Sequence, residues 1–238
     1  MVDLIEGLKK CGIQENAAPG LAQKMEAYIK EIVLFNSAYN LTNTSDRDEL
    51  VVHHILDSLA AYKVIKEKIE QRKKNVGDEN KQSCNDENNE FAKSLVLADI
   101  GSGGGLPGIP LAAAFLDEPN VRFELVERME KRCAFLENCA AILGLKNVTV
   151  VNSEAERVEA DVYDLITFRA FRPLDKKMTK TLLRIVKQGG FLCAYKAKLE
   201  NIREEMSGIS ALVPDYETVQ LNVPGLEDSE RNLVIIKK

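Results

Sequence analysis

Glycine occupies four of the five positions from 101 to 105 of this sequence, within the stretch "LADIGSGGGLPGIP". Glycine permits positive φ and places no side chain between the backbone and a ligand, so such a loop allows a bound group to approach closely. Glu127 follows 26 positions after Gly101, and a carboxylate there can accept hydrogen bonds from both hydroxyls of a ribose. Together the loop and the acid predict a site for a nucleoside.

The spacing of the glycines distinguishes two classes of cofactor. The dinucleotide pattern G-x-G-x-x-G, started at Gly101, would need glycine at the position of Leu106. Gly101, Gly103 and Gly105 instead give G-x-G-x-G, which is typical of methyltransferases that use S-adenosylmethionine. The pattern therefore favours S-adenosylmethionine and a methyltransferase over an oxidoreductase, while a purely structural glycine turn is the competing interpretation.

The same sequence bears on the acceptor atom of such a methyltransferase. Enzymes that methylate exocyclic amines often carry a D/N/S-P-P-Y/F/W loop after the fourth strand, where this chain reads "TFRAFRP". Methylation at a pyrimidine C5 needs a thiolate, and Cys193 lies inside the apolar run "FLCAY", which predicts a core residue. A ring nitrogen such as guanine N7 needs neither feature, because it has a free lone pair and no proton to lose. No side chain is therefore assigned as a general acid or base.

Charge is distributed unevenly along the chain. The formal net charge of −5 argues mildly against a nucleic-acid partner, yet residues 169–198 hold nine basic residues and one acidic residue. A local basic face on an acidic protein can hold a phosphate backbone. Lys176, Lys180, Arg184 and Lys187 recur at helical spacing, so a solvated helix face explains part of the pattern equally well.

The glycine loop and the acid must be positioned by alternating strands and helices. Strands are predicted at residues 94–100, 121–127, 147–152, 163–168, 189–196, 217–223 and 231–238, and helices at 106–116, 128–144 and 173–187. This alternation predicts an α/β fold with a seven-stranded, mostly parallel, Rossmann-like sheet, the architecture of class I methyltransferases. The last two strands follow each other without a helix and should form an antiparallel pair at one edge.

The chain divides into three predicted parts. Residues 1–70 have the apolar period of helices and form a helical cap, with Ser45 or Asp46 as an N-cap. Residues 71–93 are rich in charges and amides and predict a flexible insertion. Residues 94–238 form the domain that binds S-adenosylmethionine.

Location and metal content follow from what the sequence does not contain. We expect no membrane association, because no apolar run approaches a membrane span and the first residues lack the layout of a signal peptide. Five scattered cysteines without a C-x-x-C pair suit reduced thiols in the cytoplasm. The acidic residues show no metal-ligand spacing, and adjacent His53 and His54 would point about 100° apart on a helix, so no metal is predicted.

His54 remains a candidate on the substrate side of the site. His54 and Asp57 are three positions apart and could face one another on a helix, for which a structural hydrogen bond is the simpler interpretation.

Six motifs occur in an order that matches a known family. They are "YNLT" at 39–42, "HILDSL" at 54–59, "DIGSGGGLPGIPLA" at 99–112, "KR" with "FL" at 131–136, "FRAF" at 168–171 and "RNLVIIKK" at 231–238. Together they resemble the RsmG (GidB) family of bacterial ribosomal RNA methyltransferases over nearly the whole chain. The resemblance implies methylation of guanine N7 at one position of 16S rRNA, with that RNA or the small ribosomal subunit as partner.

The resemblance also implies roles for individual residues. It places cofactor contacts at Gly101, Leu106, Ala155, Glu156 and Arg169, and gives Glu127 the position of the ribose-binding acid. With the loop glycines, the expected cofactor set is Gly101, Gly103, Gly105, Leu106, Glu127, Ala155, Glu156 and Arg169. The expected RNA-contacting set is His54, Arg172, Lys196 and Arg231.

Two alternatives remain open from the sequence. One is a methyltransferase that acts on another RNA or on a small molecule. The other is a non-catalytic module that binds a nucleotide or RNA and retains the glycine loop.

Overall fold

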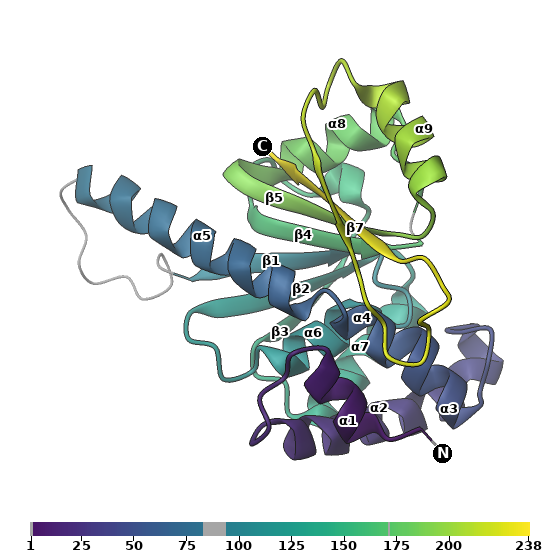
Figure 1. Cartoon of the computed structure of the whole chain (residues 1–238). Helices are drawn as coiled ribbons and strands as arrows, with labels where there is room; N and C mark the ends of the chain where they lie inside the picture. The colour runs from purple at the N-terminus through teal and green to yellow at the C-terminus, as the bar shows by residue number, and fades with distance from the viewer. Residues whose placement is uncertain (1, 83–93, 171) are drawn as a thin grey trace.

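A seven-stranded sheet forms the centre of the protein, whose computed structural model describes residues 2–82 (backbone only for 76–82), 94–170 and 172–238 (Figure 1). The strands lie in the order β3-β2-β1-β4-β5-β7-β6. Their bounds are β1 Leu95–Ile100, β2 Val121–Glu127, β3 Val148–Asn152, β4 Tyr163–Arg169, β5 Val186–Lys196, β6 Glu217–Gln220 and β7 Asn232–Lys237. The strand order reverses between β1 and β4, and in open α/β sheets ligands bind beyond the carboxyl ends of the strands at such a point.

The pairing of the strands confirms the predicted fold. β1 to β5 are joined by parallel pairs, and β7 pairs antiparallel with both β5 and β6. β6 and β7 therefore form the expected antiparallel pair at one edge. The observed architecture is the seven-stranded, mostly parallel, Rossmann-like sheet that the alternation of elements predicts.

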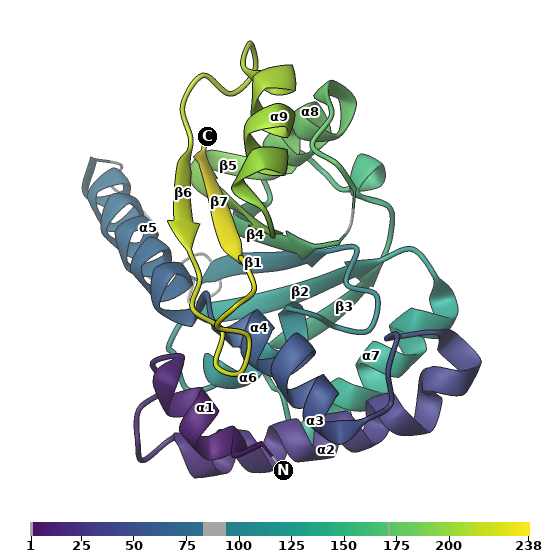
Figure 2. The ribbon, with the colours of Figure 1, turned by 45° about the vertical axis from the view of Figure 1, so that its right-hand side comes forward.

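Helices cover both faces of this sheet (Figure 2). Successive residues of a strand point to opposite faces, and along β4 Leu165 belongs to one hydrophobic cluster while Ile166 and Phe168 belong to another. The second cluster includes residues of α8 (Lys176–Ile185) and α9 (Leu199–Ile209). The first includes residues of α6 (Gly108–Ala114) and α7 (Glu130–Leu143). A short 3₁₀ helix, η3 (Ala155–Arg157), follows β3.

The N-terminal helices share the core of the α6 and α7 face. They are α1 Leu4–Lys10, α2 Ala18–Tyr39, α3 Arg47–Leu50, the π-helical segment η1 Val51–Leu56, α4 Asp57–Leu59 and α5 Tyr62–Gln82. The carboxylate of Asp46 accepts a hydrogen bond from the N–H of Glu49 at 2.9 Å, which confirms it as the N-cap of α3. The N-terminal region is thereby fixed against the sheet that carries the glycine loop.

Helix α5 is longer than the sequence pattern predicts. Residues 71–82 of the expected flexible insertion belong to this helix, and residues 83–93 lie outside the described part of the chain. Lys, Glu, Gln and Arg have high helix propensity, and Ile65, Ile69 and Arg72 provide a buried side. The Nε of Arg72 donates to the buried Asp164 carboxylate of β4 at 3.0 Å, so α5 is tied to the sheet by an ion pair that hydrophobic periodicity does not detect.

Helix α9 is the second difference, because no element was predicted for residues 199–209. Its buried residues are Ile202, Met206 and Ile209, whose spacing of four and three is that of one helix face. The period was present in the sequence at four apolar positions, since Leu199 precedes Ile202 by three, but Leu199 is 39% exposed and only the other three are buried.

Four of the five cysteines, Cys11, Cys133, Cys139 and Cys193, are buried free thiols, and Cys84 lies outside the described residues. Among the helices of the described ranges, none combines the length and apolar character needed to cross a membrane.

Candidate functional site

Three adjoining cavities lie beyond the carboxyl ends of the parallel strands. The Glu127 cavity has a volume of about 210 Å³, the His54 cavity about 370 Å³ and the Tyr195 cavity about 450 Å³. Ala170, directly after β4, lines all three, and Arg169 lines the last two. The three cavities therefore form one cleft that is divided at the end of β4.

Nearly all of the predicted site residues lie in this cleft. The Glu127 cavity is lined by the predicted residues Gly101, Glu127, Ala155, Glu156 and Arg172. The His54 cavity is lined by His54, Gly101, Gly103, Leu106 and Arg169. The Tyr195 cavity is lined by Arg169, Arg172, Lys196 and Arg231. Gly105 lines none of the three, and its role is in the packing of the loop.

The conformation of the glycine loop explains two of its glycines. Gly103 has φ of 56°, a region that favours glycine, and a Cβ there would meet no atom closer than 3.8 Å. Gly105 has φ of 89°, and a Cβ there would lie 2.6 Å from Ile109 Cγ1 and 2.9 Å from the hydroxyl of Tyr28. Glycine therefore suits position 103 because of the backbone conformation beside an open cavity. At position 105 glycine suits both the backbone conformation and the close packing of the loop on α2.

Glu127 joins the end of β2 to this loop. Its side chain is buried, with Oε2 accepting from the N–H of Gly103 at 2.9 Å and Oε1 accepting from the N–H of Met129 at 2.8 Å. An ionised carboxylate has further lone pairs on both oxygens. Glu127 can therefore hold the loop and still accept hydrogen bonds from the hydroxyls of a ribose in the Glu127 cavity.

Asp99, near the end of β1, holds the start of α6, the helix that follows the glycine loop. Its Oδ2 accepts from the N–H of Gly108 at 3.0 Å, which ties the start of α6 to the strand. Burial raises the pKa of this carboxyl to about 7, and the Gly108 hydrogen bond opposes the shift. In the described residues Oδ1 of Asp99 is buried without a hydrogen-bond partner. Asp99 is 1% exposed and lines none of the three cavities, so its carboxyl supports the loop from within the core.

The N-terminal helices also hold the loop in place. The hydroxyl of Tyr28, in α2, donates a hydrogen bond to the carbonyl of Gly104. Arg132 Nη2, from α7, donates to the carbonyl of Asn40 at 3.3 Å and its side chain lines both the Glu127 and the His54 cavities. Tyr28 therefore fixes the loop to α2, and Arg132 joins α7 to the end of the same helix.

Ala170 adopts a conformation that alanine rarely takes. Its φ is 51°, in the left-handed region, where a residue with a Cβ pays roughly 1–2 kcal/mol. Residues held in such conformations cluster at functional sites, where the surrounding structure fixes them. The position of Ala170 where all three cavities meet marks the end of β4 as the centre of the cleft.

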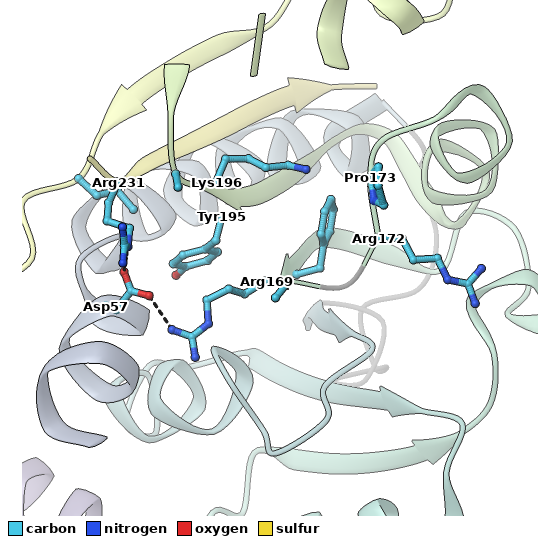
Figure 3. A pocket seen from close by; sticks show the side chains of 11 residues that line it. Asp57, Arg169, Arg172, Pro173, Tyr195, Lys196 and Arg231 are labelled. Carbon is cyan, nitrogen blue, oxygen red and sulfur yellow. Dashed lines mark hydrogen bonds and ion pairs between the residues drawn. The ribbon is translucent and has the colours of Figure 1, made fainter. Parts of the chain in front are cut away.

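One carboxylate links the two arginines at this centre (Figure 3). Asp57, at the start of α4, is 6% exposed. Its Oδ2 accepts from Arg169 Nη1 at 2.7 Å, and its Oδ1 forms an ion pair with Arg231 Nε at 3.2 Å. Each arginine comes from a different strand end, so Asp57 joins the N-terminal helices to β4 and to the segment before β7.

His54 contacts Arg169, the arginine that also pairs with Asp57. Its Nδ1 lies 3.2 Å from Arg169 Nη2. Burial lowers the pKa of His54 to about 4, and the Arg169 and His53 charges add to the effect. A neutral imidazole whose Nδ1 accepts from the guanidinium satisfies this geometry. The predicted contact between His54 and Asp57 is replaced by the approach of both side chains to Arg169.

The other predicted RNA-contacting residues also have protein partners. Lys196 pairs with Glu205 at 2.6 Å, with its ammonium 6.0 Å from the centroid of the Phe168 ring. Arg172 donates to Glu156 at 3.3 Å. These pairs hold the cations at the rim of the cleft.

The basic segment 169–198 contains both cations held by protein partners and exposed cations. Lys187 pairs with Asp164 at 2.7 Å, and Arg184 donates to the carbonyls of Ala155 and Glu156. Lys176, Lys177 and Lys180 are exposed along α8, whose first turn follows the loop that lines the cleft. Arg172, at the rim of the cleft, and Lys198, directly before α9, are exposed as well, so the exposed cations of this segment lie on α8 and at its two ends.

Sequence reasoning missed three residues that help to build the cleft. Asp57 was considered only as a partner of His54, although it lies in the motif "HILDSL". Asp99 precedes the glycines directly, and Arg132 lies within the "KR" motif, so both were visible as chemistry-bearing types near the predicted site. Their contacts depend on distant segments, which the sequence pattern does not reveal.

Cys193, which was weighed as a nucleophile, is buried, and the residue types that could bind a metal are dispersed in the described part of the chain. Burial raises the pKa of the Cys193 thiol to about 12, and its side chain is fully buried, as predicted for a core residue. Within the part of the chain that the structure describes, no three His, Cys, Asp or Glu side chains are grouped to hold a metal ion.

Comparison with known proteins identifies similar sequences over nearly the full length. The family model described as rRNA small subunit methyltransferase G (GidB) matches residues 21–78 and 83–234. A ribosomal RNA small subunit methyltransferase G from Treponema denticola is 40% identical over 240 residues, covering 99% of this chain and 93% of the relative. One from Treponema pallidum is 36% identical, covering 92% and 86%. One from Cupriavidus pinatubonensis is 35% identical, covering 98% and 91%.

Proposed function

The chain belongs to the rRNA small subunit methyltransferase G (GidB) family, and from this premise we propose that it methylates N7 of a guanine in 16S rRNA, using S-adenosylmethionine. The observation that carries the proposal is the divided cleft at the end of β4. On one side are the glycine loop and a buried acid suited to a nucleoside, and on the other is a cavity rimmed by cations. We place the enzyme in the cytoplasm, where small ribosomal subunits are assembled.

The residues on the glycine-loop side fit S-adenosylmethionine. Glu127 offers lone pairs to the ribose in the Glu127 cavity, and Gly103 leaves open space beside the loop. We propose that Gly101, Gly103, Leu106, Glu127, Ala155, Glu156 and Arg169 form the cofactor side of the cleft. Gly105 supports this side through packing on Tyr28 and Ile109.

The proposed reaction requires the protein mainly to position the cofactor and the guanine. When bound, the cofactor supplies a methyl group on a sulfonium, which is a good leaving group. The N7 lone pair forms the new N–C bond as the C–S bond breaks, and its electron pair stays on sulfur, so no proton is removed. Catalysis then consists of alignment and exclusion of water, which agrees with a cleft that offers no obvious general base.

The Asp57 network suits the charge that this reaction moves. Positive charge passes from the sulfonium to the purine ring, so two uncompensated guanidiniums nearby would oppose both reactant and product. Asp57 sits between Arg169 and Arg231 and offsets part of their charge. We therefore assign Asp57 as a positioning residue for both arginines.

The test uses small ribosomal subunits, deproteinised 16S rRNA and bulk transfer RNA from cells that lack this methylation. Each is incubated with the purified enzyme and methyl-labelled cofactor and then digested to nucleosides. We expect label in 7-methylguanosine from the ribosomal samples alone. Label in another nucleoside, or only in transfer RNA, would overturn the proposal and favour a methyltransferase of different substrate. Cofactor binding without label in any sample would favour a non-catalytic module.

A further inference from the structure

The motif "YNLT" ends helix α2 and begins a loop beside the cleft. Residues 40–45, which we call the NLT loop, join α2 to the N-cap of α3. Leu41, Thr42 and Asn43 line the His54 cavity together with residues 101–104 of the glycine loop. The NLT loop is therefore part of the wall of this cavity.

One side chain holds the backbone of the NLT loop. Asn36, in the last turn of α2, is half-buried. Its Oδ1 accepts from the N–H groups of Leu41 and Thr42, both at 2.9 Å. Its Nδ2 donates to the carbonyl of Thr44 and to Ser45 Oγ, both at 3.1 Å. An amide offers an acceptor and two donors, so both ends of Asn36 bind the loop.

The NLT loop also contacts the elements on either side of it. Asn40 has φ of 48°, in the left-handed region that asparagine tolerates, and its carbonyl accepts from Arg132 Nη2 at 3.3 Å. Leu41 packs on the glycine loop, since a Cβ built at Gly104 would lie 3.4 Å from Leu41 Cβ. The conformation that Asn36 imposes is therefore transmitted to the glycine loop.

The proposed cofactor has two parts that would occupy different cavities. The Glu127 cavity holds the acid suited to a ribose, so the nucleoside belongs there. The amino-acid chain of S-adenosylmethionine is joined to the nucleoside through sulfur. It would extend into the His54 cavity, which shares Gly101, Arg132 and Ala170 with the Glu127 cavity.

We propose that Asn36 is a positioning residue for S-adenosylmethionine, because it shapes the NLT loop against which the amino-acid end of the cofactor lies. This inference rests on the proposed function, since it concerns the same cofactor. Asn36 lines neither cavity, so it acts through the main chain of the loop.

The physical effect is the ordering of the loop before the cofactor binds. Without Asn36, the N–H groups of Leu41 and Thr42 lose their acceptor. The cofactor would then have to order the loop as it binds, and this ordering reduces affinity. The nucleoside end, which lies in the Glu127 cavity, would be bound as before.

The test compares two ligands that differ only at the end assigned to the NLT loop. S-adenosylhomocysteine carries the amino-acid chain, whereas 5′-methylthioadenosine has the nucleoside and sulfur without that chain. In Asn36→Ala, calorimetry should show an affinity for S-adenosylhomocysteine that is about 10-fold lower, the effect of ordering a few residues on binding. The affinity for 5′-methylthioadenosine should stay at the wild-type value. Glu127→Ala should instead weaken both ligands, because both contain the ribose.

Two further variants grade the effect. Asn36→Asp keeps an acceptor for the N–H groups of Leu41 and Thr42 and should recover most of the affinity for S-adenosylhomocysteine. Thr42→Val removes the hydrogen bond of 2.7 Å from Thr42 Oγ1 to the carbonyl of Thr44 within the loop. It should lower the affinity for S-adenosylhomocysteine about 3-fold, as expected for one neutral hydrogen bond, and leave 5′-methylthioadenosine unaffected.

Methyl transfer gives a second readout. In Asn36→Ala the KM for S-adenosylmethionine should rise while kcat at saturating cofactor stays near wild type, since the loss is in binding of the cofactor.

Asn147→Ala is the matched control. Asn147 is also half-buried, and its Nδ2 donates to the carbonyl of Ala112 at 2.9 Å. It directly precedes β3, at the end of the sheet opposite the cleft. This variant should unfold at a lower temperature than wild type and bind both ligands with wild-type affinity.

Two results would overturn the role of Asn36. One is an equal loss of affinity for the two ligands in Asn36→Ala or, where that variant does not fold, in Thr42→Val. The other is wild-type affinity of the same variant for S-adenosylhomocysteine. Failure of the wild-type enzyme to bind S-adenosylhomocysteine or to form 7-methylguanosine would instead contradict the proposed function.

Discussion

Glu127, on one side of the cleft, accepts hydrogen bonds from backbone N–H groups 24 and 2 positions away. Asp57, on the other side, pairs with Arg169, which is 112 positions away, and with Arg231. The glycine-loop side is therefore built by main-chain geometry within one βαβ unit, and the Tyr195 side by ion pairs between distant segments. The first can be inferred from local sequence, whereas the second exists only once the chain has folded.

The greatest loss should come from removing the charge between the two arginines. Asp57→Asn leaves both guanidiniums without their carboxylate, and removing one partner of a buried pair costs about 3–5 kcal/mol of stability. We expect a lower denaturation midpoint and a methyl-transfer rate that falls far more than cofactor affinity does. Single-turnover rates and calorimetry measure the two quantities.

Two variants separate positioning by Asp57 from a general loss of stability. Asp57→Glu keeps the charge and should restore part of the rate. Asp48→Asn alters another Asp–Arg pair, with Arg47 at the surface, and should leave transfer unchanged. An Asp57→Asn enzyme with wild-type rate at saturating substrates would show that the arginines need no such link.

The next effect concerns the glycine-loop side of the cleft. Glu127→Ala removes the acceptor for the N–H of Gly103 and for a ribose. A lost hydrogen bond to a charged group costs about 1.5–3 kcal/mol, so we expect cofactor affinity to fall roughly 10–100-fold. Glu154→Ala, in the same cavity but 41% exposed, is the control. Equal affinities for the two variants, measured by calorimetry, would contradict the role of Glu127.

A smaller effect concerns the exposed lysines of α8. Replacing Lys176, Lys177 and Lys180 with alanine should weaken retention of 16S rRNA and flatten its dependence on salt, by up to about 0.7–0.9 log units of slope for each phosphate that these lysines neutralise. Replacement of Lys63, Lys66 and Lys74, which line a separate cavity beside α5, should change neither quantity. Filter binding across a salt series decides the question. Identical slopes for the two triple variants would leave the α8 lysines as an ordinary solvated face.

The last effect concerns stability rather than methyl transfer, and it is a pH dependence at His54. Folding lowers its pKa from 6.5 to about 4, so between these values the unfolded chain binds the proton more strongly and stability falls as pH decreases. We expect the wild type to lose stability relative to His54→Gln as pH falls from 7 towards 4, and to keep a constant difference above 7. Urea unfolding at several pH values measures it. A difference independent of pH would show that His54 is not held neutral by burial.

Much of the fold could be predicted from the sequence because its signals are local. Strands β1 to β6 alternate with helical segments, and the glycines, Glu127 and the N-cap Asp46 act within short segments. Helix α9 and the end of α5 were missed for a related reason. Their buried sides carry few apolar residues, and in α5 the charged Arg72 takes a buried position through Asp164.

The candidate site divides in the same way. The residues that we propose for the cofactor could be named in advance because their motif and family resemblance are local features. The link from Asp57 to Arg169 and Arg231 could not be predicted, since it requires three segments to meet at one point. The exposure of individual side chains was equally hidden: in the basic segment 169–198 Lys187 and Lys196 are held by ion pairs, whereas the lysines of α8 are exposed.

The cleft has two separate sides, which meet at the end of β4. The decisive experiment measures single-turnover methyl transfer to 16S rRNA against cofactor concentration for wild type, Glu127→Ala, Asp57→Asn and the double variant. We predict that saturating cofactor restores most of the rate of Glu127→Ala, whereas the defect of Asp57→Asn persists at every concentration. Rescue of Asp57→Asn by cofactor, or a Glu127→Ala defect that no concentration corrects, would contradict the division.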